Sequence, residues 1–193
     1  MDVTPELIEE RRRLGIDTFD EVWDGEYRVN PFPVTAHQRV TTDLLVSLRP
    51  HLLERQHGEL LLGLNVIEAA EGWFNFRCPD LVFIAAARAG IVSRDGIRAA
   101  GPDTVFEVRS PGDDTYRKLP FYSRLGVRDV VVIHRDTKRP EVFRCAGGAF
   151  EAAAPDDQGW IRAETMGMAF RWVEGERPAV EVRDDEGRAV ARI

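Results

Sequence analysis

Cysteine is scarce in this 193-residue chain, which contains only Cys78 and Cys145. Two cysteines are too few for a disulfide framework or a zinc knuckle, so we interpret both as reduced thiols. No apolar stretch approaches the roughly 20 residues that span a bilayer. Residues 1–15 also lack the apolar core of a signal peptide. These absences predict a cytoplasmic protein that does not enter a membrane.

Positive charge is also in short supply. Lysine and arginine number 26 against 33 acidic residues, which gives a net charge of −7 and a pI near 5.2. Nonspecific binding to nucleic acid depends on neutralising phosphates, so this balance disfavours a protein that coats nucleic acid. It still allows an enzyme with a local basic face. With 44% hydrophobic residues, the composition fits a globular protein that buries a core.

Several widespread catalytic motifs are missing. Ser110 does not stand in a Gly-x-Ser-x-Gly context, and no phosphate-binding or dinucleotide-binding glycine pattern occurs. The histidines have no metal-ligand spacing relative to cysteine or to one another. These histidines are His37, His51, His57 and His134. We interpret the four tryptophans as packing residues. These alternative catalytic constellations are therefore weak.

Local signals predict two helices and several hairpins. The first helix covers residues 4–14 with Thr4 as its cap. The second runs from a cap at Thr35 to about residue 56, and Pro50 should kink or split it. Asp24-Gly25 and Gly147-Gly148 each predict a hairpin turn. Residues 59–68 and 73–78 are predicted to pair as strands, residues 85–101 to form a short helix and a loop, and residues 184–187 to form a final turn.

Residues 104–133 form the most informative unit. An apolar strand over 104–110, a helix over 113–125 and an apolar strand over 129–133 predict a crossover between strands of one sheet. The hairpins elsewhere make that sheet mixed. We predict a single domain over residues 1–193, in which 1–19 form an N-terminal helix and loop and 146–193 form a β-rich C-terminal extension.

Two carboxylates lie at the predicted strands. Asp80 follows Pro79 at the start of an apolar strand, where an aspartate is often only a turn residue. Glu107 lies in mid-strand, and the period of two places it on the same face as Arg109. A carboxylate there must be solvated, paired or bound to a metal, because burying it alone is costly. A surface pair with Arg109 or a lysine is the ordinary alternative.

A lysine follows these carboxylates. Asp114, Lys118 and Tyr122 are spaced by four residues, so a helix would align them in one stripe, which an ordinary solvated face also explains. Pro120 removes a backbone donor, so the helix either begins as late as residues 116–117 or kinks. A late start would place Lys118 in the first turn, close to the loop that leaves the strand of Glu107.

In combination, these residues resemble the Uma2 family of endonucleases (DUF820), within the PD-(D/E)XK nuclease superfamily. The resemblance covers about residues 20–145 and lies in the order of its elements, namely Asp24-Gly25-Glu26, a helix opening on His37, Pro79-Asp80, residues 106–111, and Asp114, Lys118, Tyr122 and Gly126-Val127. It implies an α/β fold with a restriction-endonuclease-like mixed β-sheet flanked by α-helices, additional β-hairpins and a metal site at one end.

The resemblance also implies the site residues. Asp80 and Glu107 would bind Mg²⁺ or Mn²⁺, and Lys118 would complete the catalytic set from the helix. Arg109 holds the usual Glu-x-Lys position. His37 would line the site, and Glu26 is a weaker addition. The implied activity is that of a Mg²⁺-dependent endodeoxyribonuclease with DNA as its substrate. Pro120 and the sequence Gly112-Asp113 depart from the family pattern.

Two other functions compete with this expectation. The first is a catalytically inactive binding or assembly module that keeps the nuclease fold, which the low pI and the lack of a basic stripe favour. The second is a hydrolase of a small phosphorylated molecule, which fits the acidity but has no motif behind it. A homodimer is the assembly we expect.

Overall fold

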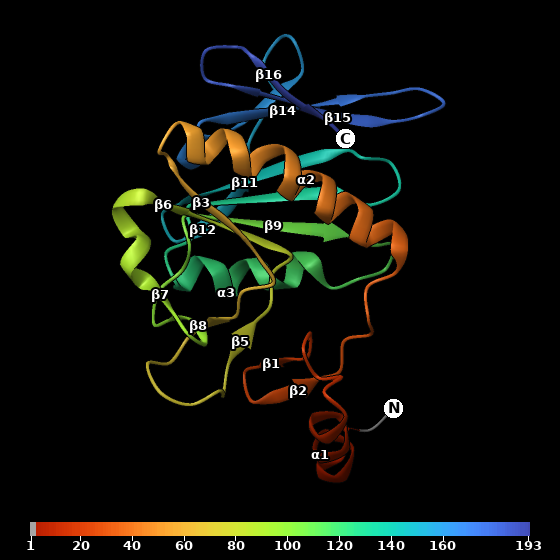
Figure 1. Ribbon diagram of the computed structural model, residues 1–193, viewed down its shortest axis with the longest axis vertical. Coiled ribbons are helices and arrows are strands. Elements are labelled where there is room, and N and C mark those ends of the chain that lie inside the picture. The colour runs from red at the N-terminus through yellow and green to blue at the C-terminus, as the bar shows by residue number, and fades with distance from the viewer. Residues whose placement is uncertain (1–2) are drawn as a thin grey trace.

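A six-stranded mixed sheet lies at the centre of the computed structural model, which describes residues 3–193 (Figure 1). Met1 and Asp2, part of the predicted N-terminal segment, lie outside the described residues. The strand order is β12-β11-β10-β9-β6-β3. The strands are β3 (Gly58–Leu62), β6 (Leu81–Ala85), β9 (Thr104–Arg109), β10 (Asp129–His134), β11 (Pro140–Ala146) and β12 (Ala149–Ala152).

The predicted crossover is confirmed. β9 and β10 are parallel, and the other neighbouring strands of this sheet are antiparallel. Between β9 and β10 the chain forms a 3-10 helix, Thr115–Lys118, and then α3 (Leu119–Arg124). The hairpin at Gly147-Gly148 is also confirmed, since it joins β11 to β12.

The two faces of the central sheet bury different helices. α2 (Thr35–Glu54) packs on the face that includes Phe106 and Val108, and α3 packs on the face that includes Val105. α2 is continuous through Pro50, so the predicted split is wrong. Pro50 lies on the exposed side of the helix, where the carbonyl that loses its partner can meet water. The predicted Thr35 cap is also wrong, because Val34 takes the N-cap position.

A second sheet packs beside α2 and shares its buried face (Figure 1). Its order is β13 (Trp160–Ala163), β14 (Met168–Val173), β15 (Ala179–Asp184) and β16 (Ala189–Arg192), all antiparallel. Phe170 and Val180 of this sheet share one apolar core with Leu44 and Leu48 of α2. The predicted turn at residues 184–187 joins β15 to β16. The single domain over residues 1–193 stays a prediction, which this shared core supports.

The N-terminal predictions are confirmed. α1 (Pro5–Leu14) has Thr4 as its cap and ends at Gly15 in the left-handed conformation. β1 (Glu21–Trp23) and β2 (Glu26–Arg28) form the predicted hairpin. Its two turn residues both have positive φ, 50° at Asp24 and 89° at Gly25, as a tight hairpin turn requires. No helix among residues 3–193 is long and apolar enough to cross a membrane.

A third sheet connects this hairpin to the centre. Its order is β2-β1-β5-β4-β8-β7, with β4 (Val66–Ile67), β5 (Phe76–Arg77), β7 (Val92–Ser93) and β8 (Gly96–Arg98). The predicted pairing of 59–68 with 73–78 is correct only for β4 and β5, because residues 58–62 pair with β6 instead. The short helix in 85–101 is a 3-10 helix, Ala86–Ile91, and the β7–β8 hairpin that follows was not predicted.

Arg77 lies between the β1–β2 hairpin and α3 and contacts both. Its guanidinium lies 4.3 Å from the ring centroids of both Trp23 and Phe121, and it donates a hydrogen bond to the carbonyl of Val22 at 2.7 Å. A buried arginine between two aromatic faces is favourable because each ring carries negative charge on its faces. This contact brings Glu21 to the end of the central sheet where β6 begins.

Candidate active site

Asp80 and Glu107 lie at one end of the central sheet. Leu81 faces Phe106 across the β6–β9 pair, so the preceding residue, Asp80, comes opposite Glu107. One Asp80 oxygen accepts a hydrogen bond of 2.7 Å from the amide of Val108. The other lies 2.7 Å from Nε2 of His37, in the first turn of α2. Asp80 is therefore held from both sides and is more than a turn residue.

The pKa of His37 is raised by its partner Asp80. Burial lowers the pKa of the imidazole, but the hydrogen bond and the charge of Asp80 outweigh it, and the pKa is raised. The cationic form of His37, which offsets the negative charge of Asp80, therefore persists to higher pH than in a free histidine.

Glu107 is buried in the same region. Its two carboxylate oxygens accept from Nζ of Lys118 at 3.1 Å and from the hydroxyl of Tyr122 at 2.6 Å. Burial raises the pKa of Glu107 to about 7, with Lys118 opposing the shift and Asp80 and Glu21 adding to it. The predicted alternative of a surface pair with Arg109 is wrong, since Arg109 instead lies 3.8 Å from Asp113.

Lys118 occupies the junction between the 3-10 helix and α3. Pro120 is the second residue of α3, where its missing N–H costs no helical hydrogen bond. The late helix start predicted from Pro120 is thereby confirmed. The Lys118 side chain is 13% exposed and lies 3.1 Å from both Glu107 and Glu21. Burial lowers the pKa of the ammonium, but these two carboxylates outweigh it and raise the pKa.

Glu21 was missed in the sequence. It is buried in the N-terminal hairpin, where its carboxylate accepts hydrogen bonds from the amide of Cys78 at 2.9 Å and from Nε1 of Trp23 at 2.7 Å. Its one sequence signal is an acidic residue beside Val22 in a strand. That signal is weak, because only the pairing of β1 with β5 brings Glu21 to Lys118. Tyr122 was noted only as part of the helical stripe.

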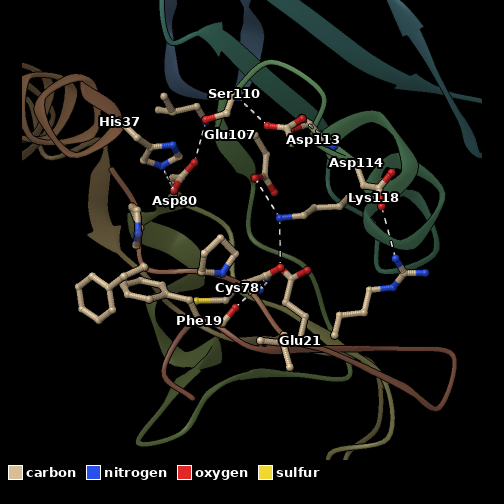
Figure 2. A pocket seen from close by; sticks show the side chains of 18 of the residues that line it. Phe19, Glu21, His37, Cys78, Asp80, Glu107, Ser110, Asp113, Asp114 and Lys118 are labelled. Carbon is tan, nitrogen blue, oxygen red and sulfur yellow. Dashed lines mark hydrogen bonds and ion pairs between the residues drawn. The ribbon is translucent and has the colours of Figure 1, made fainter. Parts of the chain in front are cut away.

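One cavity of about 940 Å³ is lined by Glu21, His37, Asp80, Glu107 and Lys118. Figure 2 shows Lys118 reaching between Glu107 and Glu21, with the His37–Asp80 pair beside them. Ser110 and Asp113 border the cavity on one side and Phe19 on the other. The Cys78 thiol also faces it, but burial raises the pKa of this thiol to about 12, so it is not a thiolate nucleophile at neutral pH.

Comparison with known proteins identifies the family. A family model described as “Uma2: Putative restriction endonuclease” matches residues 17–174. The chain belongs to the Uma2 family. The matched range contains all four predicted catalytic residues, Asp80, Glu107, Lys118 and His37. Uma2 is a family of nucleases, a class of hydrolases that act on nucleic acids.

A solved structure shows the same fold as this Uma2 chain. It is described as “a putative nuclease belonging to DUF820 from Anabaena variabilis ATCC 29413”. Its TM-score is 0.59 at 16% sequence identity, and the match covers 76% of this chain and 82% of the other. The predicted fold class, a restriction-endonuclease-like mixed sheet flanked by helices, is confirmed. No curated protein matches the chain.

The predicted Uma2 site residues separate into two groups. Asp80, Glu107, Lys118 and His37 converge on the cavity. Glu26 lies at its edge, where the side chain is 80% exposed and 3.6 Å from Arg28. Arg109 packs its guanidinium 4.9 Å from the ring centroid of Tyr116. Asp114 pairs with Arg28 and Arg117, outside the group that Lys118 forms with Glu107 and Glu21.

The carboxylates of the Uma2 site suit a hard divalent cation that takes only a few of its ligands from the protein. Asp80 and Glu107 offer carboxylate oxygens, each of which can accept more than the one hydrogen bond it now has. Within residues 3–193, no group of three or more His, Cys, Asp or Glu side chains is arranged to hold a metal ion. An ion held by two carboxylates would keep most of its water ligands, which is the behaviour of Mg²⁺.

Proposed function

We propose that the protein is a metal-dependent endonuclease that hydrolyses phosphodiester bonds in DNA. One observation carries this proposal: four side chains predicted as catalytic, from four separate segments of a Uma2 chain, meet in one cavity. These are Asp80, Glu107, Lys118 and His37. A buried ammonium between carboxylates has a high desolvation cost, so its presence at the cavity supports a chemical role.

The metal would be Mg²⁺ or Mn²⁺, held by Asp80 and Glu107. Such an ion lowers the pKa of a bound water and offsets the charge that develops on the phosphate. The affinity of hard ions for carboxylate oxygens supports this assignment.

Lys118 would supply the fixed positive charge. Glu107 and Glu21 hold its ammonium at 3.1 Å each, so it needs no reorientation when the phosphate gains charge. Preorganised charges of this kind stabilise a transition state more than mobile ones do. The same ammonium can orient the attacking water by hydrogen bonding.

His37 would act through Asp80 and at the phosphate. Its Nε2 contact keeps the Asp80 carboxylate in one orientation. Its raised pKa favours the cationic form, which attracts the phosphate of a bound strand. Both roles place His37 beside the reacting groups without requiring it to be the base.

A cleavage assay with matched variants tests the proposal. Plasmid DNA is incubated with Mg²⁺, Mn²⁺ or EDTA, and Asp80→Asn and Glu107→Gln are compared with the unchanged protein. We expect metal-dependent cutting that both substitutions abolish. Glu59→Gln serves as the control, because Glu59 is a surface carboxylate paired with Arg49 at 2.9 Å, outside the cavity. Metal-dependent cutting that survives both site substitutions would point to a contaminant.

The inactive nuclease-fold module is the second candidate. It is favoured by Lys118, whose ammonium already pairs with Glu107, one of the two carboxylates that a metal would need. Calorimetric titration with Mn²⁺ separates the two. Binding that Asp80→Asn removes supports the enzyme, and the absence of binding at millimolar Mn²⁺ supports the module. The homodimer and the cytoplasmic location stay predictions, of which the first is checked by light scattering.

A further inference from the structure

Two phenylalanines, Phe19 and Phe32, form an aromatic wall of the cavity that holds the acidic cluster of Asp80 and Glu107. Phe19 and Phe32 line the cavity together, and their ring centroids are 5.3 Å apart at an interplanar angle of 89°. Phe32 is nevertheless 66% exposed. An exposed phenylalanine costs solvation free energy, because its apolar ring stays in contact with water. Its place beside the catalytic groups suggests that a ligand covers it.

The segment that carries Phe32 is held in place. Pro31 and Pro33 flank the ring, and each proline fixes its own φ angle. Asn30 donates from its side chain to the carbonyl of Phe19 at 2.8 Å and from its amide to Asp20 at 2.9 Å. The aromatic wall therefore loses little conformational entropy when it binds a ligand.

The charge of the cavity limits which ligand can enter. Six carboxylates line it, against Arg28, Lys118, Arg135 and the imidazole of His37. The six are Glu21, Glu26, Asp80, Glu107, Asp113 and Asp114. Duplex DNA brings one negative charge for about every 1.7 Å of its axis, and its affinity for proteins depends on neutralising them. An acidic cavity provides little of that affinity, so another source of binding is needed.

Base stacking provides such a source. Aromatic side chains bind bases of a single strand through their faces, without any need for positive charge. A base within a duplex is covered on both faces by its neighbours, so only an unpaired base can reach a side chain inside a cavity. The size of the cavity, about 940 Å³, lies in the range of sites for small ligands.

We propose that the site acts on an unpaired nucleotide of single-stranded DNA, whose base stacks on Phe32 while its phosphate lies at Asp80, Glu107 and Lys118. This inference rests on the proposed nuclease function and specifies its substrate. The aromatic wall selects the strand, and the acidic cluster with its metal carries the chemistry.

Fluorescence anisotropy with labelled oligonucleotides tests this inference without relying on cleavage. The protein is titrated, with Ca²⁺ in place of Mg²⁺, into a single strand, into the matched duplex and into a strand of abasic residues. A gel confirms that each strand stays intact. The variants are Phe32→Leu, which removes the ring, and Phe32→Tyr, which keeps it. Phe74→Leu is the matched control, because Phe74 is 76% exposed and outside the cavity.

We expect the single strand to bind more tightly than the duplex. Phe32→Leu and the abasic strand should each weaken binding about 10-fold, the size of one stacked base. Phe32→Tyr and Phe74→Leu should bind as the unchanged protein does. Equal affinity for the duplex, or an unaltered affinity of Phe32→Leu, would overturn the stacking site while metal-dependent cleavage of DNA still stood. A failure to bind any DNA would overturn the inference and the nuclease function together.

Discussion

Replacing Lys118 by methionine tests the electrostatics of the site most directly. Methionine has a similar length and no charge, so Glu107 and Glu21 would remain buried without their cation. Removing one partner of a buried ion pair costs about 3–5 kcal/mol. We expect a loss of about 3 kcal/mol at pH 8, at the lower end of that range. The reason is that Glu107, whose pKa is already raised to about 7, can take up a proton.

The loss should depend on pH in a defined direction. Without Lys118, the pKa of Glu107 in the folded protein rises further above its ordinary value. At a pH between the pKa of Glu107 in the unfolded chain and its pKa in the folded variant, only the folded protein keeps the Glu107 proton. The stability of Lys118→Met therefore falls as the pH rises from the first pKa to the second. At pH 5 the folded protein holds Glu107 protonated, and the loss should shrink by at least about 1.4 kcal/mol, the equivalent of one pKa unit.

Urea unfolding at pH 5 and pH 8, followed by tryptophan fluorescence, measures both quantities. Arg117→Met is the control, because Arg117 is 62% exposed and pairs with Asp114 at the surface. Its loss should stay below about 1 kcal/mol at either pH. A loss below about 1 kcal/mol in Lys118→Met at pH 8, or one that does not shrink at pH 5, would refute the view that this ammonium neutralises buried carboxylates.

Two further predictions follow from other carboxylates. Glu21→Gln should slow single-turnover cleavage roughly 10–100-fold by releasing Lys118. The affinity of Glu21→Gln for Mn²⁺, measured by calorimetry, should equal that of the unchanged protein. A loss of this affinity would show that Glu21 is a metal ligand. At Asp184, burial opposes ionisation, but hydrogen bonds from Arg188 outweigh it and lower the pKa to about 2. Asp184→Asn should therefore lower the free energy of unfolding in urea by roughly 2 kcal/mol at pH 6, and this loss should vanish as the pH falls toward 2. A loss that is the same at both pH values would show that Asp184 contributes no charge-dependent stability.

Much of the fold could be predicted because its signals are local. The turn at Asp24-Gly25 depends on two adjacent residues, and the crossover over 104–133 depends on the apolar period within one short stretch. Pro120 limited the helix to a late start or a kink, and the structure has the late start. Features of this kind need no knowledge of distant residues.

The remainder depends on pairings between distant segments. Residues 58–62 and 73–78 are both able to form strands, and nothing local shows that the first pairs with β6. Glu21 reaches Lys118 only because Val22 pairs with Phe76 in the β1–β5 ladder. The convergence of Asp80, Glu107 and Lys118 was expected from their order and from the family resemblance, whereas the contact of Glu21 with Lys118 was not.

The dispersal of the site along the chain has a consequence for its synthesis. Glu21 and His37 leave the ribosome early, whereas Glu107 and Lys118 follow more than 60 residues later. β9 pairs with β6 and with β10, so Glu107 reaches its final position only after residue 134 has emerged. Asp80, Glu107 and Lys118 can therefore converge only late in synthesis, once both strands that flank β9 are available.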